Sequence, residues 1–333
     1  MYGSKPTSVI NLSNTLFDGH EARITTLSSL DDVLIAGGFN GEYAMTNLRS
    51  EYDTPPALGR ATEHKNGITN HIQTFRHRNG GAMKAAFCSN DEVLRILDCH
   101  TNTFSQQFTY NKAINCSSLS PNGRLRAVVG DFQETYITNA ETGLPIEKLS
   151  AHTDDVFACA WADDDIHIAT SAQDHRIVIW DARNWKEPVA VLESELAVPR
   201  SLTWSPVGGG PRVLISAESD DFVNVIDAVT WDKRQVLEFF GPVAGVAMSP
   251  DGSELFVGNA DAQYGGIMAY QRQQWNTAPT DLRSRDVFKE WLEEEELEGH
   301  ARVVFGREAR GRRELRDWGG GVDGELRLGE WVL

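Results

Sequence analysis

Three histidines lie close together in the sequence and are the first residues to consider as metal ligands. They are His64, His71 and His77, within EHKNGITNHIQTFRHRNGG. A zinc site needs several nitrogen, sulfur or carboxylate ligands that converge in space. The intervals of seven and six residues place these histidines across a loop and a strand, and no group of carboxylates accompanies them. We therefore expect loop or surface histidines and no metal site.

The other candidate chemical motifs are also weak. The acidic run Asp163-Asp164-Asp165 lacks the alternation and the distal Glu of a calcium-binding loop, so a solvated hairpin turn is expected. The acidic residues Glu218, Asp220 and Asp221 are interpreted in the same way. The sequence contains neither a Gly-x-x-x-x-Gly-Lys phosphate loop nor a Gly-x-Ser-x-Gly nucleophile motif. The sequence thus predicts no catalytic residue, no cofactor-binding residue and no metal ligand.

Cysteine content and charge restrict the class of protein. The spacings of Cys88, Cys99, Cys116 and Cys159 fit neither a zinc pair nor a disulfide scaffold, which favours reduced, buried thiols. The formal net charge of −17 argues against nucleic acid and anionic membranes as partners. The opening segment MYGSKPTSVINLSN lacks the apolar core of a secretion signal. We expect a cytoplasmic or nuclear protein that is not secreted.

The elements that must position any functional side chain recur along the chain. Each copy has an apolar strand, a turn with Asp or Asn, and a second strand, as in IATSAQDHRIVIWD. Strands upstream that end in turns such as SPNGR, and runs downstream such as LPIEKLS, bring each copy to four strands. The strand after the Asp or Asn turn is the third of the four. These third strands end 41 to 51 residues apart, at Asn47, Asp98, Asn139, Asp181, Asp227 and Tyr270. Such a period of short strands is typical of β-propeller blades.

These repeats resemble the WD-repeat β-propellers. In the fourth repeat, Ala151-His152 stands where the family has Gly-His, and Trp180-Asp181 supplies the Trp-Asp end. Segments such as LIAGGFNGE and YGGIMAY are also similar to a little-characterised group of fungal and plant WD-repeat proteins, for which no activity is known. The resemblance covers about residues 19–272 and implies an all-β fold.

The resemblance also implies a buried hydrogen-bond network in the fourth repeat. By register its members are His152, Thr170, Asp174 and Trp180, with Asp181 at the end of the motif. We expect Asp174 to accept from His152, His152 to donate to Thr170, and Thr170 to reach the indole N–H of Trp180. Each buried polar group then has a partner.

The expected domain organisation is a propeller between two different terminal segments. Six four-stranded blades are expected within 19–272, at about residues 19–66, 67–111, 112–150, 151–195, 196–240 and 241–272. Family members most often have seven blades, which favours a seven-bladed ring with a truncated blade. Within the N-terminal segment 1–18, SVINLS (8–13) either closes the last blade or remains from the seventh. Residues 273–333 are predicted to form a non-propeller tail, with an acidic helix followed by a disordered Arg- and Gly-rich stretch.

The expected function is that of a non-enzymatic scaffold or adaptor, which binds other proteins through its faces and loops and needs no cofactor. Trp185 and Trp231 follow the third strands and are equally compatible with exposed anchors and with core residues. The long loop SEYDTPPALGRATEHKNG (50–67), stiffened by Pro55 and Pro56, is a candidate recognition element.

Two alternative functions stay open. The segment Ile168–Arg183 resembles a signature of WD-repeat substrate receptors of cullin–RING ubiquitin ligases, which implies that Trp180-Asp181-Ala182-Arg183 docks on the ligase adaptor. In that case Arg183 projects from the blade and meets a carboxylate of the adaptor. A hydrolytic, lactonase-like propeller is the less favoured alternative.

Overall fold

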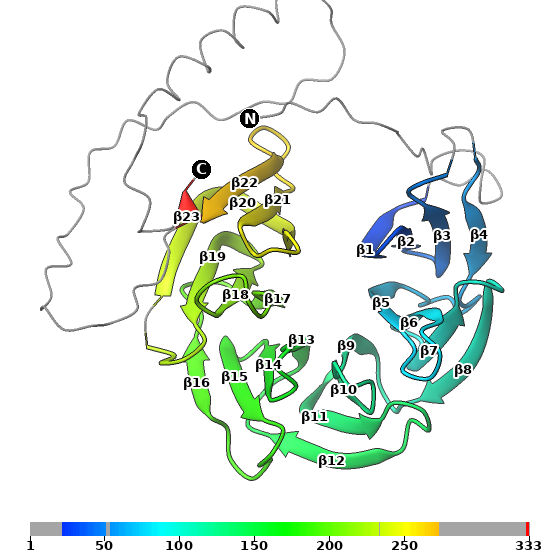
Figure 1. Ribbon diagram of the computed structural model, residues 1–333, viewed down its shortest axis with the longest axis horizontal. Coiled ribbons are helices and arrows are strands. Elements are labelled where there is room, and N and C mark those ends of the chain that lie inside the picture. Colours follow the sequence, from blue (N-terminus) through cyan, green and yellow to red (C-terminus); the bar gives the residue numbers. More distant parts are fainter. Residues whose placement is uncertain (1–21, 51–53, 233, 273–330, 333) are drawn as a thin grey trace, which may run out of the picture. The chain divides into compact units, whose positions relative to one another are not determined.

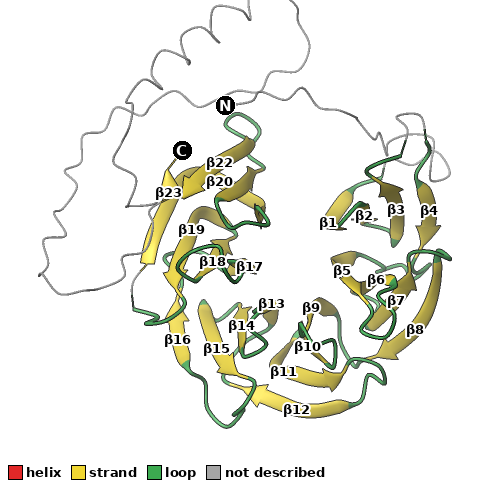
Figure 2. Cartoon of the chain, in the orientation of Figure 1, coloured by secondary structure: helices red, strands yellow, loops and turns green. Residues whose placement is uncertain are grey.

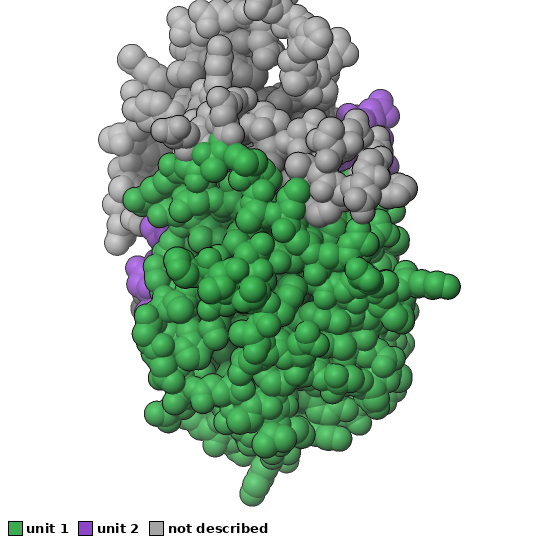
Figure 3. Space-filling model, turned by 90° about the vertical axis from the view of Figure 1, so that its right-hand side faces the viewer, with its two compact units in different colours: residues 1–204 green, residues 205–333 purple. Residues whose placement is uncertain are grey.

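The described residues fold as strands and loops alone. The computed structural model describes residues 22–50, 54–232, 234–272 and 331–332, and none of these forms a helix (Figure 2). The described part of the chain therefore offers no apolar helix of membrane-spanning length. The chain divides into two compact units, residues 1–204 and residues 205–333 (Figure 3).

Unit 1 consists of four antiparallel sheets and one further strand. Each sheet contains four strands that are consecutive in the sequence and pair in sequence order. The sheets are β1 (Ile24–Leu30), β2 (Val33–Gly38), β3 (Glu42–Asn47) and β4 (Ala57–Arg60); β5 (Thr69–Arg76), β6 (Met83–Ser89), β7 (Val93–Asp98) and β8 (Thr103–Thr109); β9 (Ile114–Leu119), β10 (Leu125–Gly130), β11 (Phe132–Asn139) and β12 (Pro145–Ser150); and β13 (Val156–Trp161), β14 (His167–Ala172), β15 (Arg176–Asp181) and β16 (Ala190–Glu193). Strand β17 (Pro199–Trp204) follows them.

Consecutive sheets of unit 1 pack against each other. Figure 1 shows the first strands β1, β5, β9, β13 and β17 on the concave side of the unit and the fourth strands on its convex side. Buried apolar side chains fill the space between neighbouring sheets. One such core joins the third and fourth sheets through Ile137, Val156 and Trp180, and another joins the first and second through Ile35, Ile72 and Phe87.

The Asp or Asn that ends each third strand has a local structural role. Its side-chain oxygen accepts a hydrogen bond from the backbone N–H two residues later, which turns the chain away from the strand. The bond is 2.8 Å long at Asp181 and 3.0 Å long at Asp98. The same bond forms at Asn47, Asn139 and Asp227. The recurring acidic or amide residue therefore belongs to turn formation rather than to catalysis.

Unit 2 contains two repeats that share a long strand. Its strands pair in the order β18 (Val213–Glu218), β19 (Asp220–Asp227), β20 (Arg234–Met248), β21 (Glu254–Asn259), β22 (Gly266–Arg272) and β23 (Trp331–Val332). Strand β20 pairs with β19 as far as Pro242 and with β21 from Val243 onward. A core that includes Ile215, Val225 and Val257 lies between the two parts of this sheet.

Strand β20 crosses the boundary expected between the blades at residues 196–240 and 241–272. Two further differences from the expectations concern the segment 50–67 and the C-terminus. The segment 50–67 is not one continuous loop, because β4 begins directly after Pro56 and pairs with β3 from Met45 to Glu42. Proline is compatible with the beginning of an edge strand, so Pro55 and Pro56 precede β4 rather than excluding it. The second difference is at the C-terminus. Trp331 and Val332, expected in a tail outside the propeller, pair with Arg272 and Gln271 of β22.

Other expectations for the termini concern residues outside the described part. The segment 8–13, a candidate strand for completing a blade, is among them, and so is the predicted acidic helix within 273–330.

Candidate functional site

Four first strands of unit 1 contain a β-bulge at the same position. In each, the pairing advances by two residues on the first strand and by one on the second strand. The extra residues are Thr25, Asn70, Asn115 and Phe157. A bulge leaves one residue out of the ladder and redirects its side chain. We call these four the bulge residues.

Three bulge residues bind the backbone of the next repeat. Thr25 Oγ1 donates to the carbonyl of Thr69 at 2.5 Å. Asn70 Nδ2 donates to the carbonyl of Ile114 at 2.9 Å, and Asn115 Nδ2 donates to the carbonyl of Val156 at 3.1 Å. These carbonyls belong to first strands of neighbouring sheets, which do not pair with each other. The bulge residues therefore join consecutive sheets where no strand ladder can.

The fourth bulge residue breaks this series. Phe157 has no polar side-chain atom and cannot donate to the next first strand. The guanidinium carbon of Arg200, on β17, instead lies 4.1 Å from the centre of the Phe157 ring. An arginine stacked on an aromatic face keeps its N–H edge free for other partners. The described residues supply no ion pair for Arg200, whose side chain is exposed.

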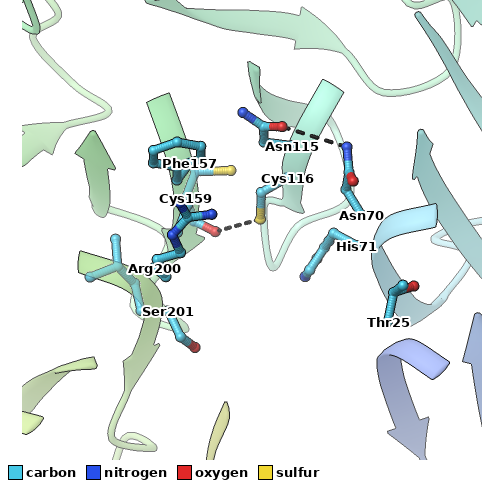
Figure 4. A pocket seen from close by; sticks show the side chains of 11 residues that line it. Thr25, Asn70, His71, Asn115, Cys116, Phe157, Cys159, Arg200 and Ser201 are labelled. Carbon is cyan, nitrogen blue, oxygen red and sulfur yellow. Dashed lines mark hydrogen bonds between the residues drawn. The ribbon is translucent and has the colours of Figure 1, made fainter. Parts of the chain in front are cut away.

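The bulge residues line a cavity of about 340 Å³ within unit 1. His71, Cys116, Cys159, Arg200 and Ser201 complete most of its wall. Figure 4 shows His71 and Arg200 on opposite sides of the cavity, with Cys116 between them. Among the described residues, no Asp or Glu belongs to the wall of this cavity. The cavity is therefore polar and carries basic groups, although the whole chain is acidic.

His71 is not the loop or surface histidine that the sequence suggested. It lies on β5, opposite Cys88 in the ladder, directly after the bulge. Its Nδ1 is buried and has no hydrogen-bond partner among the described residues. Burial lowers the pKa of His71, but the neighbouring thiols of Cys116 and Cys88 outweigh this effect and raise it.

The other two histidines of the run lie elsewhere. His64 is exposed and His77 is half-buried, both in loops. No group of three or more potential ligands for a metal ion is present in the described ranges.

The cysteines beside His71 lie in the polar wall and are reduced. Cys116 donates from Sγ to the carbonyl of Cys159 at 3.5 Å, and Cys159 donates to the carbonyl of Ala127 at 3.8 Å. Hydrogen bonding to Cys159 and the nearby His71 lower the pKa of Cys116 against the effect of burial. Burial raises the pKa of Cys159. Both thiols are thus held by backbone carbonyls.

A second group of functional candidates is the network of the fourth repeat, which the structure places within hydrogen-bond distance. His152 Nδ1 lies 3.2 Å from Asp174 Oδ2, and His152 Nε2 lies 2.9 Å from Thr170 Oγ1. Trp180 donates from its indole nitrogen to Thr170 Oγ1 at 3.1 Å. Asp174 also accepts from the backbone of Thr153 and Arg176. The network connects the loop before β13 to β14, the β14–β15 hairpin and β15.

The direction of one bond in this network differs from the expectation. Burial lowers the pKa of His152, so its imidazole is neutral at physiological pH. A neutral imidazole has one N–H, and the carboxylate of Asp174 takes it at Nδ1. Nε2 is then an acceptor, and the hydroxyl of Thr170 donates to it. His152 therefore accepts from Thr170 rather than donating to it.

The residues predicted to contact partners have different surroundings. Arg183 has a side chain that is 69% exposed, but Asp181 already binds it through Nη2 at 2.6 Å and through Nε at 2.9 Å. Hydrogen bonds from Arg183 lower the pKa of Asp181 to about 2. Trp185 is half-buried and packs edge-on against Trp161, with ring centres 6.3 Å apart. These contacts make Trp185 part of the core margin.

The remaining predicted contact residues lie outside both sites. Trp231, in unit 2, is half-buried at a positive φ of 63°. Pro55 is exposed and Pro56 is half-buried at the beginning of β4. The sequence motifs do not identify the bulge residues or Arg200. Their only sequence signal is the equal spacing of Thr25, Asn70 and Asn115 within successive repeats.

Comparisons with known proteins agree with this geometry. Residues 143–181 match the family model of the WD domain, G-beta repeat. This segment contains the whole network of the fourth repeat. The solved structure of the Dos1 propeller superposes with a TM-score of 0.57 at 16% identity, covering 72% of this chain and 68% of that one. The chain thus contains a WD repeat and has the fold of a β-propeller.

The relatives of this chain differ in how much of their own length is matched. An uncharacterized protein of Schizosaccharomyces pombe is 25% identical over 273 residues, which are 77% of this chain and 73% of the relative. Protein HIR1 of Mycosarcoma maydis is 29% identical over 39% of this chain and 13% of its own length. WD repeat-containing protein 1 of Rattus norvegicus is 25% identical over 39% of this chain and 22% of its own length.

Replacing Trp180 tests the fourth-repeat network. Trp180 is 2% exposed, so Trp180→Ala is expected to lower the free energy of unfolding by about 3–5 kcal/mol, because a cavity forms and Thr170 loses a donor. Trp180→Phe keeps most of the ring and should cost less. Arg183→Ala should change stability little, because its pair with Asp181 is exposed. Chemical denaturation measures all three, and a larger loss for Arg183→Ala than for Trp180→Ala would contradict this assignment.

The neutral state of His152 gives a pH dependence. Its pKa in the folded protein lies below 6.5, so the unfolded chain binds a proton more readily as the pH falls below that value. The stabilisation by His152 is therefore complete above 6.5 and decreases at lower pH. We expect the difference in unfolding free energy between wild type and His152→Asn to shrink between about pH 7.5 and about pH 5.5. A difference that grows toward acidic pH would mean that a charged pair with Asp174 dominates.

Proposed function

We propose that this protein is a non-enzymatic scaffold that binds other proteins at the cavity of unit 1. The WD-repeat propeller fold supports protein–protein interaction in general. The observation that supports this particular site is the set of bulges. Four successive first strands direct one side chain each to the same cavity, and three of these side chains are fixed by hydrogen bonds to a neighbouring repeat. A binding site prepared in this way loses little conformational entropy when a partner enters.

The chemistry of the wall favours binding over turnover. Asn70 and Asn115 use their amide N–H groups for the joints between repeats, that is, for hydrogen bonds to a backbone carbonyl of the next first strand. Cys116, a thiol of the wall beside His71, is 6% exposed and donates to a carbonyl. The remaining groups include a guanidinium and an aromatic ring, which are the types that contribute most at protein interfaces. This cavity replaces the loop 50–67 as the preferred contact, because β4 occupies part of that segment.

Filling the cavity tests the proposal. Ser201 lies in its wall and is half-buried, so Ser201→Trp places an indole where a partner would enter. Gln173→Trp adds the same bulk on the exposed β14–β15 hairpin and serves as the matched control. Affinity purification with quantitative mass spectrometry should recover a partner with wild type and with Gln173→Trp, and lose it with Ser201→Trp. Equal recovery of every partner with all three proteins would exclude the cavity as the contact.

A second candidate function is docking on a cullin–RING ligase adaptor through Arg183. The supporting observation is that Arg183 is exposed at the end of β15 and that Asp181 holds its guanidinium in one orientation. A fixed guanidinium with free N–H groups suits a carboxylate of an adaptor. We expect the adaptor to co-purify with wild type and, in a smaller amount, with Arg183→Lys. It should be absent with Arg183→Ala. Recovery that does not depend on residue 183 would remove this candidate.

A further inference from the structure

The cavity of unit 1 has a charge opposite to that of the chain around it. The chain contains 48 acidic and 31 basic residues, yet the wall includes Arg200 and His71 and no carboxylate from the part of the chain that the structure describes. The described residues place no acidic side chain in an ion pair with Arg200. A basic group that has no carboxylate partner in a protein so rich in carboxylates indicates a binding site for an anionic ligand.

The position of Arg200 follows from the break in the bulge series. At the three other joints, a bulge residue donates to a backbone carbonyl of the next first strand. At the fourth joint, Phe157 supports the guanidinium by stacking, at 4.1 Å. The carbonyl of Pro199, which a bulge residue would otherwise reach, accepts instead from Ser171 Oγ at 2.9 Å. The joint is therefore satisfied without Arg200, whose N–H groups are free to bind a ligand.

The opposite wall provides a second basic group, His71. Its Nδ1 is buried beside the thiols of Cys116 and Cys88, whereas the ring as a whole is half-buried and lines the cavity. Figure 4 shows the ring of His71 extending from β5 into the cavity, opposite Arg200. Two nitrogen-bearing groups thus face one space of about 340 Å³, which is large enough for a side chain and part of its backbone.

We propose that this cavity receives an acidic side chain, Asp or Glu, from a partner protein, with its carboxylate bound between Arg200 and His71. The inference rests on the proposed scaffold function and adds the chemical class of the group that is recognised. Arg200 binds the carboxylate through its N–H edge while Phe157 holds the plane of the guanidinium. Asn70 and Asn115 keep the wall in place and do not bind the ligand themselves.

Charge reversal combined with peptide selection tests the inference even while the partner is unidentified. A random peptide library displayed on phage is selected on the full chain as wild type, as Arg200→Glu and as Arg124→Glu. Arg124 is exposed in the turn between β9 and β10, so its reversal changes the net charge equally at a distance from the cavity wall. We expect wild type and Arg124→Glu to select peptides with a shared Asp or Glu, and Arg200→Glu to lose that selection.

Affinities of the selected peptides then show how much the carboxylate contributes and whether it must belong to a peptide. By fluorescence anisotropy, we expect the affinity to fall about tenfold or more with Arg200→Glu and with the peptide in which Glu is replaced by Gln. The affinity should fall less with His71→Phe. Thermal unfolding confirms that each variant is folded. Glutarate is the free dicarboxylate competitor, and it should displace the peptide only weakly, because it lacks the neighbouring peptide contacts.

Three results would overturn the inference. Peptides without a shared acidic residue, or peptides bound equally by wild type and Arg200→Glu, would show that the cavity does not recognise a carboxylate. Glutarate that binds as tightly as the peptide would assign the cavity to a small molecule. Failure to select any peptide would remove the cavity as a peptide site. If a partner is still recovered with wild type and lost with Ser201→Trp, the proposed scaffold function would stand in each of these cases.

Discussion

The first strands of neighbouring sheets cannot pair with one another, and this constraint determines the arrangement of unit 1. Backbone groups at the ends of these strands are buried and need partners. A bulge in each strand frees one side chain, and at three joints that side chain donates to the carbonyl of the next strand. The same bulges bring residues from successive repeats to one cavity. Structural joint and candidate site are therefore products of one backbone irregularity.

The fourth-repeat network solves a similar problem within one sheet. Thr170 is completely buried, and its hydroxyl can both donate to His152 and accept from Trp180. Asp174 fixes the tautomer of His152, so one carboxylate at the hairpin sets the direction of the whole chain of hydrogen bonds. Unlike the cavity, this network is not a candidate binding site, because each of its polar atoms already has a hydrogen-bond partner within the sheet. A site for a partner requires polar atoms that the fold leaves unused, as at Arg200.

The sequence predicts the repeats well because strand alternation and turn residues are local signals. The network could also be predicted, because the resemblance to the WD-repeat family places His152, Asp174 and Trp180 at fixed positions within one repeat. The cavity could not, because a one-residue bulge does not disturb the apolar pattern enough to be seen. His71 illustrates the difficulty. Its neighbours in sequence suggest a loop, and only its pairing opposite Cys88 places it in the wall. Strand β4 was missed because four residues after two prolines give almost no pattern.

The departure of one repeat from the others is more informative about function than the features they share. Residues that repeat, such as the Asp or Asn at the end of each third strand, meet a requirement common to all repeats. Phe157 does not meet the requirement that Thr25, Asn70 and Asn115 meet, and the resulting gap is covered by Ser171. The compensation would be unnecessary if position 157 were polar. An aromatic residue at this joint instead stacks on Arg200 at the cavity, and the proposed carboxylate would give the guanidinium a partner from outside the fold.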